Sequence, residues 1–593
     1  MKNFVIIVQF LSNYVLSQTP QVILISPDFN EITPTMNPEI RATFNVDMDS
    51  STFDELSFTV FGERSGYHSG DIRYTKITRT ALFNSYELFN AGERVTVLLS
   101  NQIRSLQGDT LIGFSWVFRI PAGIAPVNFT EPIAYGGGGD FMQCTDMNND
   151  NYPDLVTSSG IIWLNDGSGV FSESWIIQDV TFDQPLLADD FNRDGNMDVF
   201  YYGFDGLKIG IGDGMGNFTF STKPFWFRDF ISADFNGDGY PDVAGLIGVT
   251  YIPPDSTTLD WAIAFNDGTG EFNNTTLFKV GGGGYPVSLI AADLDNDGDI
   301  DIVIASQPHV IPQGIFGING IIIGINNGYG IFDIFDLYPE EYSLRIGFPS
   351  YLYCSDYNND EFNDVVVISS SGGVVALNSK TGTFGYDTSN VRGFWPAELS
   401  SPITGGDING DTWIDLMVSG YEWPPEFGIP YYAVNLNNVS YFPGFWNNDF
   451  NDTLPTGHIL AVEVADLDGD LDLDLVHCGA GIYITFSEDS ATSVRDNLEV
   501  LNDFYLYQNY PNPFNNMTTI NLETNANQFT RISIYNLLGE EVRFLEEKVF
   551  YIGNHRITWD GKDNKGNNLP SGVYIIHANS FNSSQHVKAI LIK

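Results

Sequence analysis

The chain has 593 residues, with 75 acidic and 26 basic side chains and a formal net charge of −49 at pH 7. A surface with this charge disfavours unaided binding to nucleic acid and to anionic membranes. Hydrophobic residues account for 43% of the chain, and 59 Gly and 28 Pro divide it into short segments with hardly any stretch of helical period. The composition predicts an all-β protein, and the length implies several domains.

Residues 1–17 have the features of a secretory signal. Lys2 precedes an apolar stretch, and the segment ends on Ser17 with Val15 two residues before it. The apolar stretch is too short to span a bilayer, and no later segment approaches a transmembrane helix. The alternative is a strand buried at the N-terminus. We expect a secreted protein.

Residues 19–123 form a separate predicted module of short strands, among them VILISP, IRATFNVDM and RVTVLLS, with polar turns between them. This pattern is typical of a β-sandwich. The module resembles the bacterial Ig-like domain of S-layer type, through ISPDFNEI, ATFNVDMDSSTF and FNAGERVTVLLSNQIRSLQGDTL. The resemblance implies a role in spacing or adhesion, and a purely rigid spacer is the simpler alternative.

The next part of the chain repeats one acidic loop seven times. Each copy has Asp at loop positions 1, 5 and 9 and Asp or Asn at position 3, and an apolar residue follows directly. A hard cation that takes about six to eight oxygen ligands requires such an alternation of side-chain oxygens. The copies are DMNNDNYPD from Asp146, DFNRDGNMD from Asp190, DFNGDGYPD from Asp234, DLDNDGDID from Asp293, DYNNDEFND from Asp356, DINGDTWID from Asp407 and DLDGDLDLD from Asp466.

The EF-hand is the obvious competing interpretation of these loops. It requires a bidentate Glu at position 12 and flanking helices. None of the seven copies has Glu there, and the segments that follow, such as DVVVISS and DIVIASQ, are short and rich in β-branched residues. The residues at position 12 are Thr157, Tyr201, Gly245, Ile304, Val367, Val418 and His477. The EF-hand interpretation is rejected.

A second repeated element lies downstream of five loops, for example WLNDGSGVF (163–171) and AFNDGTGEF (264–272). It is typical of a β-hairpin, with a Gly/Asn turn and an aromatic residue that starts the next strand. Loop and hairpin together predict one four-stranded blade per repeat. The chain here resembles the FG-GAP/VCBS repeat family of β-propellers, related to the integrin α-subunit head, over roughly residues 125–490. The resemblance implies a seven-bladed propeller, which we place at 124–495.

The same resemblance implies calcium as the ion, up to seven of them, with side-chain ligands at positions 1, 3, 5 and 9 and a backbone carbonyl at position 7. The implied side-chain ligands are Asp146, Asn148, Asp150, Asp154, Asp190, Asn192, Asp194, Asp198, Asp234, Asn236, Asp238, Asp242, Asp293, Asp295, Asp297, Asp301, Asp356, Asn358, Asp360, Asp364, Asp407, Asn409, Asp411, Asp415, Asp466, Asp468, Asp470 and Asp474.

Position 6 of the loop departs from the family pattern in three copies. Gly is usual there because the turn needs a left-handed backbone, which glycine adopts without a steric penalty. The last three loops have Glu361, Thr412 and Leu471 instead. We therefore expect the weakest metal occupancy in the fifth, sixth and seventh loops.

The C-terminal stretch, 503–593, follows a predicted linker at 496–502. It contains YQNYPNPFNNMTTINLE, RISIYNLLGEEVR, HRITWDGKDNKGNNLPSGVYIIHA and, at its end, HVKAILIK. This succession resembles the C-terminal sorting domain of type IX secretion cargo, an Ig-like sandwich. The resemblance implies a partner in the type IX secretion machinery and a place outside a Gram-negative bacterium or on its outer surface. An ordinary terminal Ig-like domain is the alternative.

Motifs for catalysis are absent. The seven His are scattered, and neither HExxH nor G-x-S-x-G occurs. The three cysteines predict free thiols, with Cys144 and Cys354 in the propeller interior, and not a disulfide framework or a zinc site. We therefore expect no enzyme. The leading interpretation is adhesion to, or recognition of, an extracellular protein or glycan. A propeller-based polysaccharide lyase or hydrolase and a passive surface-layer component are the alternatives.

Four aromatic clusters could serve as ligand platforms: PFWF (224–227), GFWP (393–396), YEWPP (421–425) and PGFW (443–446). Neighbouring prolines suggest exposed loops, in which Trp could stack on sugar rings. Packing between blades is the simpler explanation for these aromatic residues. Longer intervals between repeats mark loop insertions, and binding surfaces are common on such loops.

Overall fold

The computed structural model describes residues 19–124, 129–181, 184–252, 256–281, 284–307, 309–311, 314–316, 320–336, 349–369, 372–380, 391–394, 402–421, 430–435, 459–479, 481–487, 504–506, 509, 511–512, 514–515, 517–524, 528–536, 541–550, 553–580 and 584–592. The predicted secretory signal and the predicted linker at 496–502 lie outside these residues, as do part or all of the aromatic clusters 393–396, 421–425 and 443–446.

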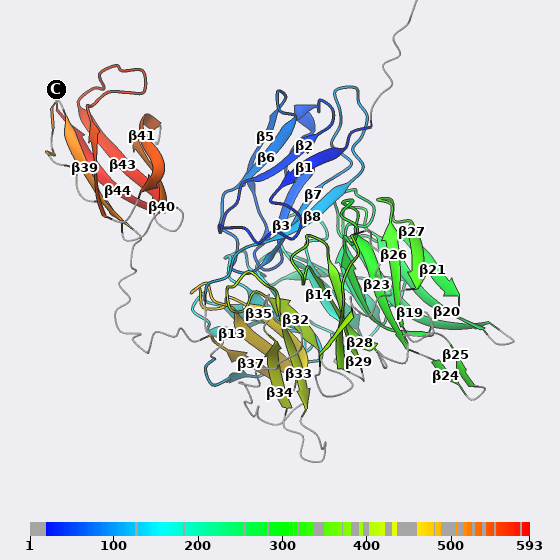
Figure 1. Ribbon diagram of the computed structural model, residues 1–593. Coiled ribbons are helices and arrows are strands. Elements are labelled where there is room, and N and C mark those ends of the chain that lie inside the picture. Colours follow the sequence, from blue (N-terminus) through cyan, green and yellow to red (C-terminus); the bar gives the residue numbers. More distant parts are fainter. Residues whose placement is uncertain are drawn as a thin grey trace, which may run out of the picture. The chain divides into compact units, whose positions relative to one another are not determined.

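The described residues form β-strands, with one 3-10 turn at Ser50–Thr52 and no α-helix among them (Figure 1). The predicted all-β class is confirmed. No helix in this part of the chain is long and apolar enough to cross a membrane. The chain divides into two compact units, Met1–Ser490 and Ala491–Lys593.

The first unit begins with two antiparallel sheets that we call the N-terminal sandwich. Buried residues alternate along β2 and β6, as in strands with one covered face, and side chains of both sheets, among them Phe44 and Trp116, form one core. The Ig-like assignment stays a prediction. One sheet has the order β1 (Val22–Ser26), β2 (Ile40–Phe44), β6 (Thr80–Ser85), β5 (Gly70–Thr75), and the other β4 (Gly66–Tyr67), β3 (Phe58–Gly62), β7 (Arg94–Leu99), β8 (Phe114–Arg119).

Seven further antiparallel sheets follow among the described residues of this unit. The first has β10 (Met142–Thr145), β11 (Asp154–Thr157), β12 (Ile161–Asn165) and β13 (Phe171–Ile176). The second has β14 (Leu186–Asp189), β15 (Asp198–Gly203), β16 (Gly206–Gly212) and β17 (Phe218–Thr222). The third has β18 (Phe230–Ala233), β19 (Asp242–Ile252), β20 (Ser256–Phe265) and β21 (Asn274–Gly281).

The fourth sheet has β22 (Tyr285–Ala292), β23 (Asp301–Gln307), β26 (Gly320–Asn326) and β27 (Phe332–Asp336), with a separate hairpin of β24 (His309–Ile311) and β25 (Gly314–Phe316) inserted after its second strand. The fifth has β28 (Pro349–Ser355), β29 (Asp364–Ser369), β30 (Gly372–Ala376) and β31 (Val391–Phe394). The sixth has β32 (Ile403–Gly406), β33 (Asp415–Tyr421) and β34 (Pro430–Asn435).

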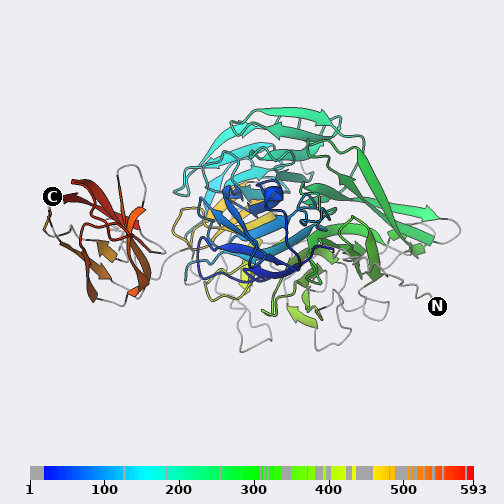
Figure 2. The same cartoon turned by 90° about the horizontal axis from the view of Figure 1, so that it is seen from above.

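The seventh sheet closes the arrangement. It has β35 (Ile459–Ala465), β36 (Asp474–Gly479) and β37 (Ile482–Thr485), and its fourth strand is β9 (Ile133–Tyr135), from before the first sheet. The first strand of each sheet contacts the first strand of the next, and β35 contacts β10. The sheets therefore form a closed ring, seen from above in Figure 2, and β9 ties its two ends together. No sequence feature had predicted this pairing.

The ring has two ends. Each acidic loop joins the first strand of its sheet to the second, so all seven loops lie at one end, which we call the loop end. The second strand turns into the third at the other end, which we call the hairpin end, where β15 meets β16 and β19 meets β20. The buried Cys144 and Cys354 lie on first strands, and Cys478 lies on β36; all three are free, as predicted.

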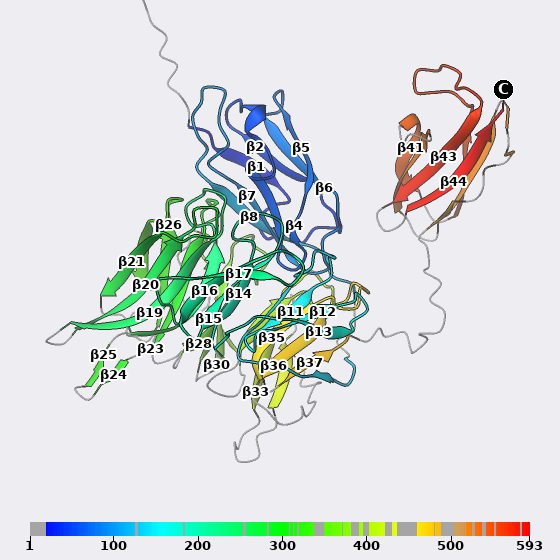
Figure 3. The ribbon, with the colours of Figure 1, turned by 180° about the vertical axis from the view of Figure 1, so that it is seen from behind.

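The N-terminal sandwich covers the loop end (Figure 3). Its backbone donates to loop carbonyls at three places: Asn101 N to Gly237 O at 2.8 Å, Ser115 N to Gly298 O at 2.7 Å and Gly123 N to Leu471 O at 2.7 Å.

Arg119 of β8 extends this contact to the first strand of the fifth sheet. Its Nη2 donates to the Ser355 hydroxyl at 3.1 Å and to the Tyr353 hydroxyl at 3.3 Å. The sandwich is therefore packed on the ring through buried polar contacts.

The second compact unit is also a two-sheet sandwich. Residues of both sheets, among them Ile520, Trp559, Ile534 and Ile576, share one core. One sheet has the order β38 (Phe504–Leu506), β39 (Thr518–Thr524), β42 (Gly553–Trp559), and the other β41 (Glu541–Phe550), β40 (Gln528–Tyr535), β43 (Gly572–Ser580), β44 (Ser584–Leu591).

Candidate functional site

The seven acidic loops have one common construction. Position 1 directly follows the first strand of its sheet and position 9 is the first residue of the second strand, in every copy. The sheet therefore holds both ends of the loop, and positions 2 to 8 form the turn between them. The predicted ligand residues are brought together loop by loop, and not across loops.

Position 9 is the most buried of the four predicted ligand positions, with at most 1% of each residue exposed. One oxygen of its carboxylate accepts the backbone N–H of position 2, at 2.8 to 3.2 Å in all seven loops. The other oxygen accepts a backbone N–H at or just after the end of the third strand, at 2.7 to 2.8 Å in six sheets. This Asp therefore ties the loop to the third strand, a task that the sequence did not indicate.

The carboxylate at position 1 fixes the far side of the turn. One of its oxygens accepts the backbone N–H of position 6, at 2.6 to 3.1 Å in all seven loops. A carboxylate oxygen has two lone pairs, so each of these oxygens can accept an amide and still contact a cation.

The loop backbone is left-handed at two positions in every copy, with φ of 54° to 78° at position 4 and 68° to 99° at position 6. Glu361, Thr412 and Leu471 adopt the same turn as the glycines, at a cost of about 1–2 kcal/mol each. Surrounding contacts hold this backbone. The Glu361 carbonyl accepts a hydrogen bond from Asn30 Nδ2 at 3.1 Å, and the Leu471 carbonyl accepts one from the backbone N–H of Gly123 in the sandwich. These departures from Gly therefore do not change the loop backbone.

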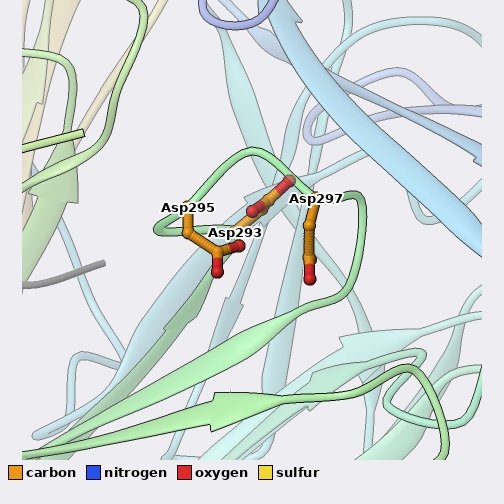
Figure 4. Close-up of side chains that lie close together, drawn as sticks. All are labelled: Asp293, Asp295 and Asp297. Carbon is orange, nitrogen blue, oxygen red and sulfur yellow. The ribbon is translucent and has the colours of Figure 1, made fainter. Parts of the chain in front are cut away.

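Three carboxylates converge in the two loops that have Asp at position 3. The ligand atoms of Asp293, Asp295 and Asp297 lie within 4.8 Å of one another (Figure 4), and those of Asp466, Asp468 and Asp470 do so in the seventh loop. In the other five loops position 3 is Asn, and in four of them its side chain is bonded within the turn, as in Asn148 Nδ2 to Asp150 Oδ2 at 2.9 Å.

Burial raises the pKa of the carboxyl group at position 1 in all seven loops, and that of several carboxyl groups at position 9. It raises the pKa of Asp146 to about 6, that of Asp190 to about 7 and that of Asp301 to about 9, and neighbouring loop carboxylates add to the effect. Some side-chain oxygens of the loops are buried and have no hydrogen-bond partner: Oδ1 of Asp293, of Asp295, of Asn358 and of Asp407. Burial and mutual repulsion both disfavour the charged carboxylates, and a bound cation would offset both effects.

The residues therefore fit a hard divalent cation. Positions 1, 3 and 5 would supply side-chain oxygens, and position 9 would hold the loop and contribute an oxygen. The cation would neutralise the carboxylates and join the two strands that the loop connects. Whether each loop binds a metal stays a prediction.

The raised pKa values predict an unusual pH dependence for the metal-free protein. In the unfolded chain these carboxyl groups have pKa values near 3.8, so the folded state binds more protons between pH 4 and about 8. The free energy of unfolding then falls as the pH rises through that range. Buried His68 and His477, whose pKa values burial lowers to about 4, act in the opposite sense but are outnumbered.

We expect the protein, freed of metal by dialysis against a chelator, to melt at a higher temperature at pH 5 than at pH 8. With calcium present this difference should shrink or reverse, because a bound ion keeps the carboxylates charged. Calorimetry at both pH values with and without calcium measures the effect. A metal-free protein that is more stable at pH 8 than at pH 5 contradicts it.

Four asparagines at or just after the end of the third strand have a structural role that the sequence did not reveal. Asn326 Nδ2 donates to the Phe235 carbonyl in the acidic loop of the preceding sheet at 2.9 Å and to the Ile300 carbonyl of its own loop at 3.1 Å. Asn165, Asn266 and Asn378 make the equivalent pair of bonds. These residues join neighbouring loops around the ring. The signal was the Asn in WLNDG, AFNDG, GINNG and ALNSK, which the sequence analysis treated only as part of a turn.

One cluster in the N-terminal sandwich has residue types found in hydrolases. Ser65 Oγ lies 2.7 Å from His68 Nε2 and 2.7 Å from Glu93 Oε1. All three residues are buried, and Glu93 also accepts the backbone N–H groups of Arg64 and Asn90. The cluster holds the turn after β3, and its burial closes the hydroxyl to a substrate.

The chain matches two protein-family models. The FG-GAP-like repeat matches residues 190–245, 234–304 and 356–418, which include five of the seven loops. The secretion system C-terminal sorting domain matches residues 508–593. No curated protein matches the chain. The predicted repeats and the predicted sorting domain are confirmed, and the tail places the protein outside the cell or attached to its surface.

Solved structures with some similarity include three of different kinds. A structure on recognition of non-reducing terminal N-acetylglucosamine by an Agrocybe aegerita lectin has 17% identity over 64% of this chain and 86% of the lectin, with a TM-score of 0.36. A quinoprotein alcohol dehydrogenase-like protein of Bacteroides thetaiotaomicron has 12% identity over 80% of this chain and 100% of that chain (TM-score 0.31). PorZ of Porphyromonas gingivalis, a surface component of the type IX secretion system, has 11% identity over 97% and 100% (TM-score 0.17).

Proposed function

We propose that this chain, with its FG-GAP-like repeats and its sorting tail, is a calcium-stabilised seven-bladed β-propeller that recognises an extracellular protein or glycan at the cell surface. The ion would be structural: it would neutralise each acidic loop and stabilise the join between first and second strands. The type IX secretion machinery would be the partner of the C-terminal sandwich.

The observation that supports a recognition role is the position of the N-terminal sandwich. It covers the loop end of the ring through the contacts of Asn101, Ser115, Gly123 and Arg119, which leaves the hairpin end uncovered by that module. Among the described residues of the ring, the longest additions lie at the hairpin end. Strands β19 and β20 have 11 and 10 residues, against four in β18 of the same sheet, and the β24–β25 hairpin is inserted there.

The paired strands β19 and β20 extend the third sheet well beyond its first strand. Their register continues from Val243↔Ala264 to Ile252↔Ser256. At about 3.3 Å per residue, the extra length projects on the order of 20 Å past the end of β18. The base of this extension packs in the core between the third and fourth sheets through Leu246 and Leu259. Insertions on a rigid scaffold are common places for binding. We therefore assign recognition to the hairpin end.

The test is saturable binding of the full chain, in calcium, to an array of glycans and a panel of extracellular matrix proteins. We expect at least one ligand. We expect its affinity to fall when the segment 249–258, which contains the end of β19 and the start of β20, is replaced by a short glycine turn. Tyr329→Ala, an exposed tyrosine at the loop end, is the matched control and should leave binding unchanged. Absence of saturable binding to the whole panel contradicts recognition and favours the passive surface-layer alternative.

A further inference from the structure

An aromatic and cationic cluster lies at the hairpin end of the second, third and fourth sheets. Trp226 lies in the segment between β17 and β18, and Tyr285 is the first residue of β22. β18 and β22 both run from this end to an acidic loop, so the cluster is on the end of the ring opposite the sandwich. Trp226 is 50% exposed.

Arg228 lies against both rings. Its guanidinium carbon is 4.6 Å from the centre of the Tyr285 ring and 6.0 Å from that of the Trp226 ring. Cation–π contacts at exposed sites stabilise by about 0.5–1 kcal/mol each, enough to orient a long side chain. Within the part of the chain that the structure describes, this guanidinium has no carboxylate partner, although the chain carries 75 acidic residues. Its N–H donors are therefore available to a ligand.

The segment that carries Trp226 and Arg228 is held rigidly by the residue between them. Phe227 is fully buried, its N–H donates to the Tyr202 hydroxyl at 2.6 Å, and that hydroxyl donates to the Phe227 carbonyl. The N–H of Arg228 donates to the Leu246 carbonyl at 2.6 Å. The rings of Tyr202 and Trp226 lie 6.4 Å apart. Such a site loses little conformational entropy when a ligand binds.

We propose that Trp226, Arg228 and Tyr285 form a binding site for a sugar unit that carries a carboxylate group. A half-exposed indole offers a flat apolar surface to the C–H face of a sugar ring, and a guanidinium is the side chain best matched to a carboxylate. The unpaired charge of Arg228 favours a carboxylated sugar over a neutral one.

The site suits an isolated carboxylated sugar, and not a polyanion. The net charge of −49 repels a long chain of carboxylates. Salt screens the repulsion from acidic residues more than about 8–10 Å away, so a single carboxylate can still bind beside Arg228. The inference rests on the proposed recognition function and names the ligand class and the residues.

The test uses the full chain in calcium and two soluble oligosaccharides that differ only in a terminal glucuronic acid or a terminal glucose. We expect calorimetric titration to show tighter binding of the glucuronate, by about tenfold, because a hydrogen bond to a charged group stabilises by about 1.5–3 kcal/mol. Arg228→Gln should lower the affinity for the glucuronate to that for the glucose. Trp226→Ala should weaken both, and Tyr329→Ala neither, with melting temperatures unchanged.

Equal binding of the two sugars by the unaltered chain, or no effect of Trp226→Ala on either, overturns this inference. The proposed function fails separately. If the full chain binds a partner on the array and Trp226→Ala and Arg228→Gln leave that binding intact, recognition stands and this site does not carry it. If nothing on the array binds, both proposals fail.

Discussion

Removal of calcium is expected to lower the melting temperature of the first compact unit by about 10 °C or more. A site filled at a hundred times its dissociation constant stabilises the folded state by about 2.7 kcal/mol, and the contributions of several sites add. A modest extracellular affinity, with a dissociation constant of about 10⁻⁴–10⁻³ M, suffices for this effect in the presence of millimolar calcium. The physical origin is the set of buried carboxylates, whose repulsion the ion relieves in the folded state alone.

The measurement is scanning calorimetry of the full chain with calcium and with a chelator, together with the metal content of the dialysed protein. We expect up to seven ions per chain. Because Ala, unlike Asn, leaves no side-chain oxygen at position 3, Asp295→Ala and Asp468→Ala should each remove about one ion from the two loops with three converging carboxylates. If the protein holds no metal in calcium and its melting temperature does not change when chelator is added, the acidic loops are only solvated turns.

Asp301→Ala is expected to destabilise the protein by about 2–6 kcal/mol whether or not calcium is present. The Asp301 carboxylate is fully buried and accepts the N–H of Leu294 at 2.8 Å and that of Asn326 at 2.7 Å. Truncation leaves both N–H groups buried without an acceptor, and each such group costs about 1–3 kcal/mol. The tie between the fourth loop and the third strand of its sheet is lost at the same time.

Asp295→Ala is the matched control in the same loop. Its side chain is partly exposed, and its predicted role is confined to the metal. The control should therefore lose stability only in calcium. In chelator it should be at least as stable as the unaltered chain, because Asp295 repels the neighbouring carboxylates Asp293 and Asp297. Denaturant unfolding of both variants under both conditions separates the two roles. Equal loss from Asp301→Ala and Asp295→Ala in calcium, with no loss from either in chelator, would mean that position 9 acts only as a ligand.

The sequence predicted the repeating part of the structure because each repeat specifies it locally. The Asp at positions 1, 5 and 9, the Gly or Asn turns and the short β-branched runs act within a few residues of one another, and each copy repeats them. The loop residues, from Asp146 at position 1 of the first loop to Asp474 at position 9 of the seventh, accordingly occupy equivalent places in all seven loops. Glu361, Thr412 and Leu471 adopt the same left-handed turn as the glycines, because tertiary hydrogen bonds to their carbonyls override intrinsic backbone preference. The expectation of weaker metal occupancy in the last three loops stays a prediction.

The sequence by itself determined the strands, the loop pattern and the sorting tail, since these depend on spacing and residue type over short distances. The tertiary structure decided which segments meet: β9 completes the seventh sheet from some 350 residues away, Asn326 joins two loops, and the N-terminal sandwich covers the loop end. It also decided that the Arg228 guanidinium lies against the rings of both Trp226 and Tyr285. Contacts between distant segments depend on the closure of the ring, and no local pattern encodes them.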